Sequence, residues 1–257
     1  PNFIINFEKF LNPDYLPQLT EALFTAKSGT FQERRDAIRF NTFGITTTEP
    51  RGTKTRVGTA LMVDQEGYFL TSAQMVTELE AGKIGQPLLR PPKIFNPKTG
   101  EGFLVTSMIV DPERNIALSF APFGSEKKPT PSLQLRRDLK NGENLLVLGL
   151  GFDQTGQRIG RSYVSGSLNS LEPEKTGNLL DQLRLSDANP VPMGQGAAIM
   201  DQEGKVVGVR SLPIITGFLS PQFKDTSFVT LDSLANIGSK RLHVYSSPIN
   251  IKEDSFE

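Results

Sequence analysis

Two distant segments of this chain share one pattern, in which an apolar run, the turn Asp-Gln-Glu-Gly and a second apolar run follow one another. The first copy lies at residues 61–70 and the second at residues 198–207. Because glycine adopts positive φ without strain, each turn favours a tight β-hairpin. Two such hairpins, far apart in one chain, predict a fold assembled from two related β units.

The rest of the chain from about Ile38 onward has short β-type runs broken at close intervals by Gly, Asn, Asp and Pro, which is typical of a sandwich or barrel. Further strands are predicted at residues 103–110, 116–120, 144–150, 158–168, 182–185 and 227–230. Residues 81–102 are rich in Gly, Pro and Lys and predict a long surface loop, and residues 211–225 predict a second irregular insertion. A short closing helix is expected at residues 230–238, ended by Gly238.

The first 37 residues differ from this β pattern and predict two short helices. Asp14 can cap a helix that extends to about Lys27, and Thr30 and Glu33 have the spacing of a capping box. The apolar residues expected to face the downstream body are Phe24, Phe31 and Ile38.

Composition excludes several kinds of site. The 28 basic and 28 acidic residues give no net charge, so there is no long-range attraction for nucleic acid or for an anionic membrane surface. The absence of cysteine excludes disulfides, zinc thiolate sites and cysteine nucleophiles. No apolar run is long enough to cross a bilayer, and no metal-loop or nucleotide-loop spacing is present, so neither a metal nor a cofactor is expected. The chain begins at Pro1, so we expect a mature or trimmed fragment.

Three further segments carry a family likeness: L-T-S-A-Q-M-V at residues 70–76, D-P-E-R-N-I-A-L at residues 111–118 and D-A-N-P-V-P-M-G-Q-G-A-A-I-M at residues 187–200. With residues 139–152 and 163–168 they keep the order and spacing of the family's motifs between about residues 38 and 238. The chain resembles the trypsin-like protease domain of the HtrA/Deg family.

This resemblance implies an all-β fold, a trypsin-like double six-stranded β-barrel with short N-terminal helices and a C-terminal closing helix. It divides the chain into an N-terminal helical segment at residues 1–37, a domain of two β-barrels at residues 38–240 and a C-terminal tail at residues 241–257.

The catalytic positions implied by the resemblance hold no catalytic side chains. Gln74 stands at the position of the histidine, Asn115 at that of the aspartate and Gln195 at that of the serine. An amide cannot take and return a proton near neutral pH, and glutamine has no nucleophilic hydroxyl. Met193 stands at the position where the family has a glycine whose amide points toward the oxyanion. That glycine has positive φ, a backbone conformation that is energetically unfavourable for methionine. We therefore interpret the domain as a pseudoprotease.

Other residues are candidates for contact with partners. In the resemblance, residues 211–225 form a loop beside the specificity pocket, and its apolar residues are candidate partner contacts: Leu212, Ile214, Ile215, Phe218, Leu219 and Phe223. His243 is the only histidine, and it is far in sequence from every triad position, so we interpret it as a surface or packing residue.

Three functions remain open. The first is a scaffold or assembly component that acts by protein–protein interaction, through the N-terminal helices and the insertions at residues 81–102 and 211–225. The second is a peptide-binding or chaperone-like module that uses the retained groove near residues 182–185. The third is a hydrolase with a non-standard site. The resemblance further implies an extracytoplasmic location, such as the periplasm, and a homo-oligomer, without nucleic acid and without direct membrane insertion of this fragment.

Overall fold

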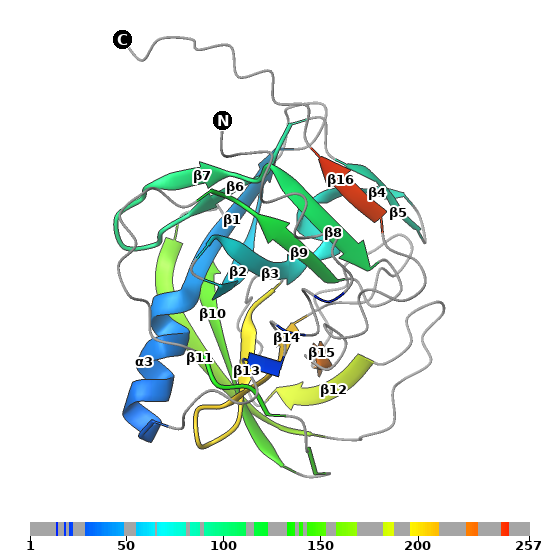
Figure 1. The fold of residues 1–257 in the computed structure, drawn as a ribbon. Helices are drawn as coiled ribbons and strands as arrows, with labels where there is room; N and C mark the ends of the chain where they lie inside the picture. Colours follow the sequence, from blue (N-terminus) through cyan, green and yellow to red (C-terminus); the bar gives the residue numbers. More distant parts are fainter. Residues whose placement is uncertain are drawn as a thin grey trace.

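The described part of the chain folds into curled antiparallel sheets, and a helix at residues 31–41 packs against them (Figure 1). The computed structural model describes residues 14, 18, 21–22, 29–48, 55–64, 66–80, 83–87, 90–111, 116–122, 133–136, 139–140, 143–152, 158–168, 182–187, 196–210, 225–230 and 243–246. The strands fall into three sheets: a large sheet built mainly from the first half of the chain, a closed barrel from the second half, and a separate two-stranded hairpin. The segment at residues 133–136 lies between the two halves in the sequence.

The first half forms a curled sheet with the order β16-β8-β9-β3-β2-β1-β6-β7. Its strands are β1 (Thr42–Thr48), β2 (Thr55–Asp64), β3 (Tyr68–Ser72), β6 (Lys93–Phe95), β7 (Gly102–Leu104), β8 (Ser107–Asp111), β9 (Ile116–Phe120) and β16 (His243–Ser246). All the pairings are antiparallel. The last strand, β16, therefore returns from the C-terminal end of the chain to the first half.

The second half forms a closed six-stranded barrel with the order β10-β11-β12-β15-β14-β13. Its strands are β10 (Asn144–Phe152), β11 (Arg158–Leu168), β12 (Gln182–Asp187), β13 (Ala198–Met200), β14 (Val206–Arg210) and β15 (Asp225–Thr230). The predicted closing helix lies outside the described residues, except for Thr230. Because the first sheet has eight strands in the described residues, the prediction of two six-stranded barrels is not confirmed.

The two Asp-Gln-Glu-Gly hairpins are confirmed. Strands β2 and β3 form the first and β13 and β14 the second, and the turn glycines Gly67 and Gly204 have φ of 108° and 82°. Each hairpin also shifts register beside its turn, between Met62 and Asp64 in one and between Ile199 and Met200 in the other. The two halves thus share a register shift beside the hairpin turn as well as a sequence pattern.

The predicted capping box is also confirmed, at the start of α3 (Phe31–Asn41). The Thr30 amide donates to the Glu33 carboxylate over 2.6 Å, and the Glu33 amide donates to the Thr30 hydroxyl over 3.2 Å. Ile38 is buried as expected, and Phe31 remains 40% exposed. Phe31 is the first residue of α3, and a carbon of its ring lies 3.5 Å from a Cβ placed on Gly204, so it faces the second hairpin turn. Phe24 lies outside the described residues.

The predicted helix before α3 is described only in part. Gln18, Glu21 and Ala22 are helical, and the backbone amide of Gln18 donates to the carbonyl of Asp14 over 3.1 Å. Helix α3 ends at Asn41, beyond the boundary at residue 37 that we predicted for the N-terminal segment.

The predicted loop at residues 81–102 was wrong, because two strands lie within it. Strand β5 (Lys83–Pro87) pairs with β4 (Thr77–Glu80) in a separate hairpin, and β6 joins β1 to β7. Composition suggested a loop because these strands are short and bounded by prolines and glycines. The side chain of Asn96 then forms the turn between β6 and β7 by accepting from the Lys98 amide over 2.8 Å.

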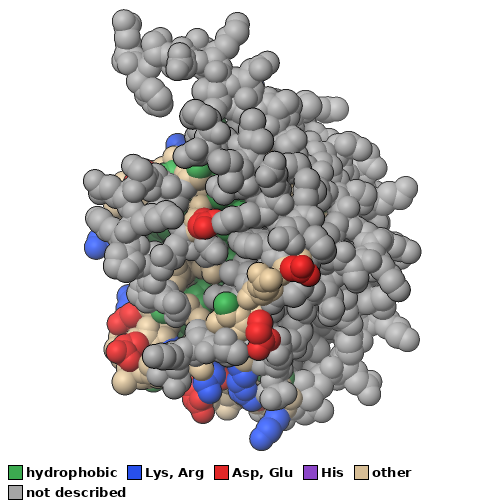
Figure 2. Space-filling view, viewed as in Figure 1, with side chains coloured by type: hydrophobic (Ala, Val, Ile, Leu, Met, Phe, Trp, Pro, Cys, Tyr) green, Lys and Arg blue, Asp and Glu red, His purple; other side chains and the backbone are tan. Residues whose placement is uncertain are grey.

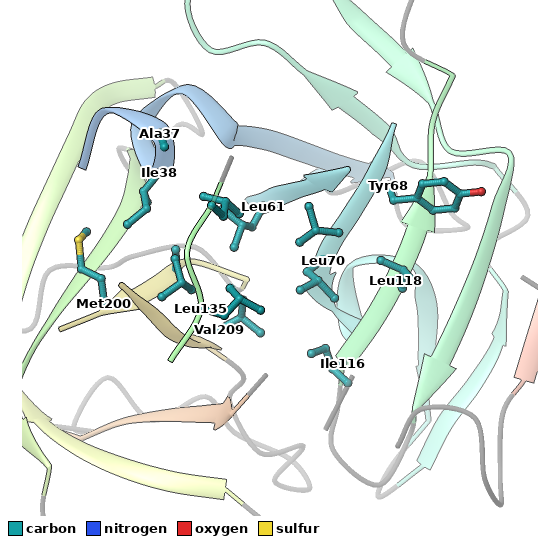
Figure 3. Close-up of a cluster of buried hydrophobic side chains, with 14 of the residues drawn as sticks. Ala37, Ile38, Leu61, Tyr68, Leu70, Ile116, Leu118, Leu135, Met200 and Val209 are labelled. Atoms are coloured by element: carbon teal, nitrogen blue, oxygen red, sulfur yellow. The ribbon is translucent and has the colours of Figure 1, made fainter. Parts of the chain in front are cut away.

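One hydrophobic core spans both halves (Figure 3). Its members come from α3, from the first sheet, from the connecting segment at residues 133–136 and from the barrel of the second half, and include Ala37, Ile38, Leu61, Leu70, Leu118, Leu135, Met200 and Val209. A second cluster fills the first sheet, where the rings of Phe43 and Phe69 meet edge to face at 5.1 Å. Because the first core is continuous, the two halves pack as one body.

Candidate functional site

The segment that holds Gln74 is a buried turn at the end of β3. It forms the 3-10 helix η1 (Ala73–Met75), in which the carbonyl of Ala73 accepts from the Val76 amide over 3.1 Å and from the Thr77 hydroxyl over 2.9 Å. Ala73, Met75 and Val76 are buried. The backbone at position 74 is therefore fixed against the core, while nothing is described of the Gln74 side chain.

The chain neighbour of Asn115 lies at the same end of β3. Strand β9 begins at Ile116, and Ile116 is the direct register partner of Ser72, the last residue of β3. Both residues are fully buried. Asn115 itself lies outside the described residues.

The chain neighbour of Gln195 packs against β3 from the second barrel. Gly196 has a φ of 84°, and a Cβ placed on it would lie 2.8 Å from the hydroxyl oxygen of Thr71 and 3.1 Å from the Thr71 Cα. Two backbone hydrogen bonds of 2.8 Å, from Gly196 to the carbonyl of Arg210 and from Arg210 to that of Ala197, hold it there. The neighbours of all three predicted triad positions thus lie together at the end of β3.

Two buried threonines fasten this junction between the halves. The Thr71 hydroxyl donates to the Thr59 carbonyl over 3.0 Å, and the Thr59 hydroxyl accepts from the Leu150 amide of the second barrel over 3.3 Å. Both side chains are fully buried. Sequence reasoning missed them, although Thr59 lies just before the first hairpin motif at residues 61–70.

The described side chains at the junction include the hydroxyl groups of Thr59, Thr71 and Ser72 and the apolar groups of Ala73, Met75 and Ile116, all of them buried. No cluster of three potential metal ligands occurs in the described part of the chain. The shifted pKa values lie elsewhere, at Glu33 of α3 and at Arg136 and Glu203 near the second hairpin turn.

An ion-pair network lies at that second turn. Asp201, with 3% of its surface exposed, accepts from the amides of Glu203 and Lys205 at 2.9 and 2.8 Å and from Arg136 at 3.2 Å. Arg136 also donates to both carboxylate oxygens of Glu143. The hydrogen bond to Glu143, followed by that to Asp201, raises the pKa of Arg136 against the effect of burial. The network fixes the connecting segment between the halves to the turn and has no reacting group.

The other predicted site residues are outside the described part of the chain. These are the triad position Gln195, the oxyanion position Met193 and the candidate partner contacts Leu212, Ile214, Ile215, Phe218, Leu219 and Phe223. Their roles stay predictions. His243 lies in β16, where it is the register partner of Val110. No helix within the described residues has the length and apolar character needed to cross a membrane.

Solved structures with a similar fold are proteases. The HtrA-type protease AlgW, solved with a tripeptide, is 17% identical, has a TM-score of 0.59 and matches 81% of this chain and 62% of its own. The active form of the Rv3671c protease from M. tuberculosis is 17% identical, has a TM-score of 0.57 and matches 81% of this chain and 85% of its own. The chain therefore spans less than two thirds of AlgW, and at these identities the likeness concerns the fold.

Sequence comparison identifies the family. No curated protein has a sequence significantly similar to this chain. The family model of the trypsin-like peptidase domain, however, matches residues 58–209, a span that begins at the first hairpin and includes both hairpins and the junction. Because this match covers more than half of the chain, the protein belongs to the trypsin-like peptidase domain family.

Proposed function

We propose that this protein is a catalytically inactive, HtrA-like member of the family that acts by binding other proteins, as a scaffold or an assembly component. One observation carries the proposal: the chain neighbours of the three triad positions meet at the end of β3, and the positions hold Gln74, Asn115 and Gln195. The frame that would bring a triad together is present, and the side chains at its positions are amides.

The chemistry of these side chains supports inactivity. Peptide hydrolysis in this fold requires a hydroxyl nucleophile, a base for its proton and a carboxylate that orients the base. Serine proteases without triad members retain about 10³–10⁴-fold acceleration over water, which comes from the oxyanion hole and substrate binding. With Met193 in place of the turning glycine, we expect even this residual acceleration to be reduced.

Exposed apolar side chains support a role in binding. The large apolar residues exposed in the described part of the chain are Phe31, Phe40 and Leu104, at 40%, 47% and 46%. Phe31 belongs to the N-terminal segment that we predicted as a contact surface. Phe40 of α3 and Leu104 of the edge strand β7 lie just beyond the predicted segments at residues 1–37 and 81–102. Among the side chains coloured in Figure 2, charges of both signs lie side by side at the α3 end of the molecule.

The test is an activity assay joined to a binding assay. The purified chain is incubated with unfolded proteins and with a fluorogenic peptide library, beside an active protease of the same fold. We expect no cleavage by this chain and the specific recovery of a partner protein by crosslinking in extracts of the native source. Cleavage that disappears on substitution of a named residue of this chain would refute the proposal.

We also propose an extracytoplasmic location for this protein. Cell fractionation of the native source tests it.

A second function is favoured by one feature of the barrel. Strand β12 pairs with β11 only from Leu185 to Asp187, so within the described residues Gln182, Leu183 and Arg184 pair with β15 alone. A strand with one open edge can bind an extended peptide through its backbone, and AlgW was solved with a tripeptide and with a decapeptide. Binding of extended peptides that is lost in Leu183→Pro and kept in Leu183→Val would support this function over a scaffold.

A further inference from the structure

Strand β16 is an addition to the edge of the first sheet from the far end of the chain. Its four residues pair antiparallel with β8, with His243 opposite Val110, Val244 opposite Ile109, Tyr245 opposite Met108 and Ser246 opposite Ser107. The pairing runs along most of β8, whose other edge pairs with β9. Without β16, the outer edge of β8 would present free backbone donors and acceptors.

The strand reaches this edge by crossing between the two halves. Strand β15, which ends at Thr230, belongs to the second barrel, whereas β16 lies beside β8 in the first sheet (Figure 1). Residues 231–242 connect them, and a fully extended segment of this length spans at most about 40 Å. Strand β16 also lies beyond the residues 58–209 that match the family model. The connection is therefore long enough for the strand to reach an edge outside its own barrel.

Strand β8, with which β16 pairs, lies in the buried core. Ser107, Met108, Ile109 and Val110 of β8 are each at most 4% exposed, so β8 is a buried strand of the first sheet. The sequence known to fit its edge is His243–Ser246, and every copy of the chain carries that sequence. An exchanged strand would make the same register and the same hydrogen bonds, so exchange changes only the path of residues 231–242.

We propose that the β8 edge is an interaction site for a second copy of this chain, occupied by β16 of that copy in a strand-exchanged dimer. The interaction is reciprocal, because each copy donates residues 243–246 to the other and receives the same segment in return. The proposal does not depend on whether the chain cleaves peptide bonds, so a proteolytically active protein would leave it unaffected.

Because the native chain lacks cysteine, a disulfide between two engineered cysteines reports the pairing of β16 with β8 without any background of native disulfides. Ser107 and Ser246 are register partners, and directly opposite residues in antiparallel strands have Cα atoms about 4.5–5.5 Å apart, within the range of a disulfide. The single variants Ser107→Cys and Ser246→Cys, one of them carrying a size tag, are mixed, unfolded in urea, refolded together at high protein concentration and oxidised. Non-reducing gels and mass spectrometry then identify the linked species.

We expect a disulfide-linked heterodimer whose yield rises with protein concentration. The matched control replaces Ser107→Cys by Ser119→Cys, because Ser119 has Phe69 and Met108 as its register partners, and this pair should give no heterodimer above chance collision. The double variant Ser107→Cys/Ser246→Cys, refolded when dilute and oxidised, should close within one chain and lose the ability to dimerise.

Light scattering on the native chain provides a readout that needs no variant. A monomer–dimer equilibrium that the oxidised double variant lacks supports the exchange. The proposal is overturned if the native chain is monomeric up to its solubility limit. It is equally overturned if the mixed variants yield no more heterodimer than the Ser119→Cys control.

Discussion

Gly196 lies against the carbonyl oxygen of Thr59, so closely that a Cβ placed on Gly196 would collide with that oxygen. Its φ of 84° adds a conformation that residues with side chains rarely adopt. Gly196→Ala should therefore lower the free energy of unfolding by about 3 kcal/mol or more, since the clash adds to the cost of positive φ. Urea unfolding followed by circular dichroism measures this loss.

Gly100→Ala is the matched control for that substitution. Gly100 has a similar φ of 77°, but nothing lies within 4 Å of a Cβ placed on it. It should cost only the conformational part, about 1–2 kcal/mol. Equal losses in the two variants would mean that the close packing of Gly196 on Thr59 contributes nothing to stability.

The buried carboxylate of Asp201 gives a second prediction. Asp201→Asn keeps an oxygen for the two turn amides but removes the charge that faces Arg136, so the free energy of unfolding should fall by about 2 kcal/mol. Chemical denaturation of the variant measures the change.

The Lys205–Glu203 pair provides the comparison, because it joins the same turn over 2.7 Å but its glutamate side chain is 66% exposed. Glu203→Gln should leave the free energy of unfolding unchanged within error. A loss in Glu203→Gln as large as in Asp201→Asn would show that burial does not decide the strength of these interactions.

Much of the fold could be predicted because its signals are local. The Asp-Gln-Glu-Gly turns ending in Gly67 and Gly204 specify hairpins from four residues each, and the pair Thr30 and Glu33 specifies the start of α3. The spacing of the family motifs likewise indicated that positions 74, 115 and 195 converge, and the described neighbours of these positions do meet.

What could not be predicted depends on contacts between distant residues. Strand β6 has only three residues, and its place is set by β1, where the ring of Phe95 covers Gly44. Strand β16 is defined by β8, from which it is separated by more than half of the chain. The exposure of Phe31 depends on where α3 begins relative to the turn at Gly204. Neither the periodicity nor the composition of a segment indicates which distant residues it will contact.

A third prediction concerns acid stability at the capping box. The backbone and side-chain hydrogen bonds from Thr30 lower the pKa of Glu33 from its ordinary value of 4.5. The unfolded chain therefore binds this proton first as pH falls, so the contribution of Glu33 to stability is complete above about pH 4.5 and is lost as pH drops through the folded pKa.

Nuclear magnetic resonance of the Glu33 carboxyl should give a titration midpoint below 4.5. Glu33→Gln keeps a side chain that can accept from Thr30 but does not titrate in this range. The stability difference between the native chain and this variant should consequently shrink on acidification, whereas a difference independent of pH would contradict the prediction.

The fourth prediction separates the two defects proposed for the active site. The triple variant Gln74→His/Asn115→Asp/Gln195→Ser supplies the side chains of a triad but leaves Met193 in place. The resemblance places Met193 where the family's turning glycine presents an amide to the oxyanion, and loss of one oxyanion donor costs about 10²–10³-fold in rate. Adding Met193→Gly to the triple variant should therefore raise peptide hydrolysis by about 10²-fold or more, measured as release of a fluorescent leaving group under single-turnover conditions.

Met193→Ala in the same background is the control, since alanine shortens the side chain without relieving the cost of positive φ. If the triple variant alone hydrolyses peptides as fast as the variant with Met193→Gly, Met193 is no barrier and the triad substitutions account for the whole loss of activity.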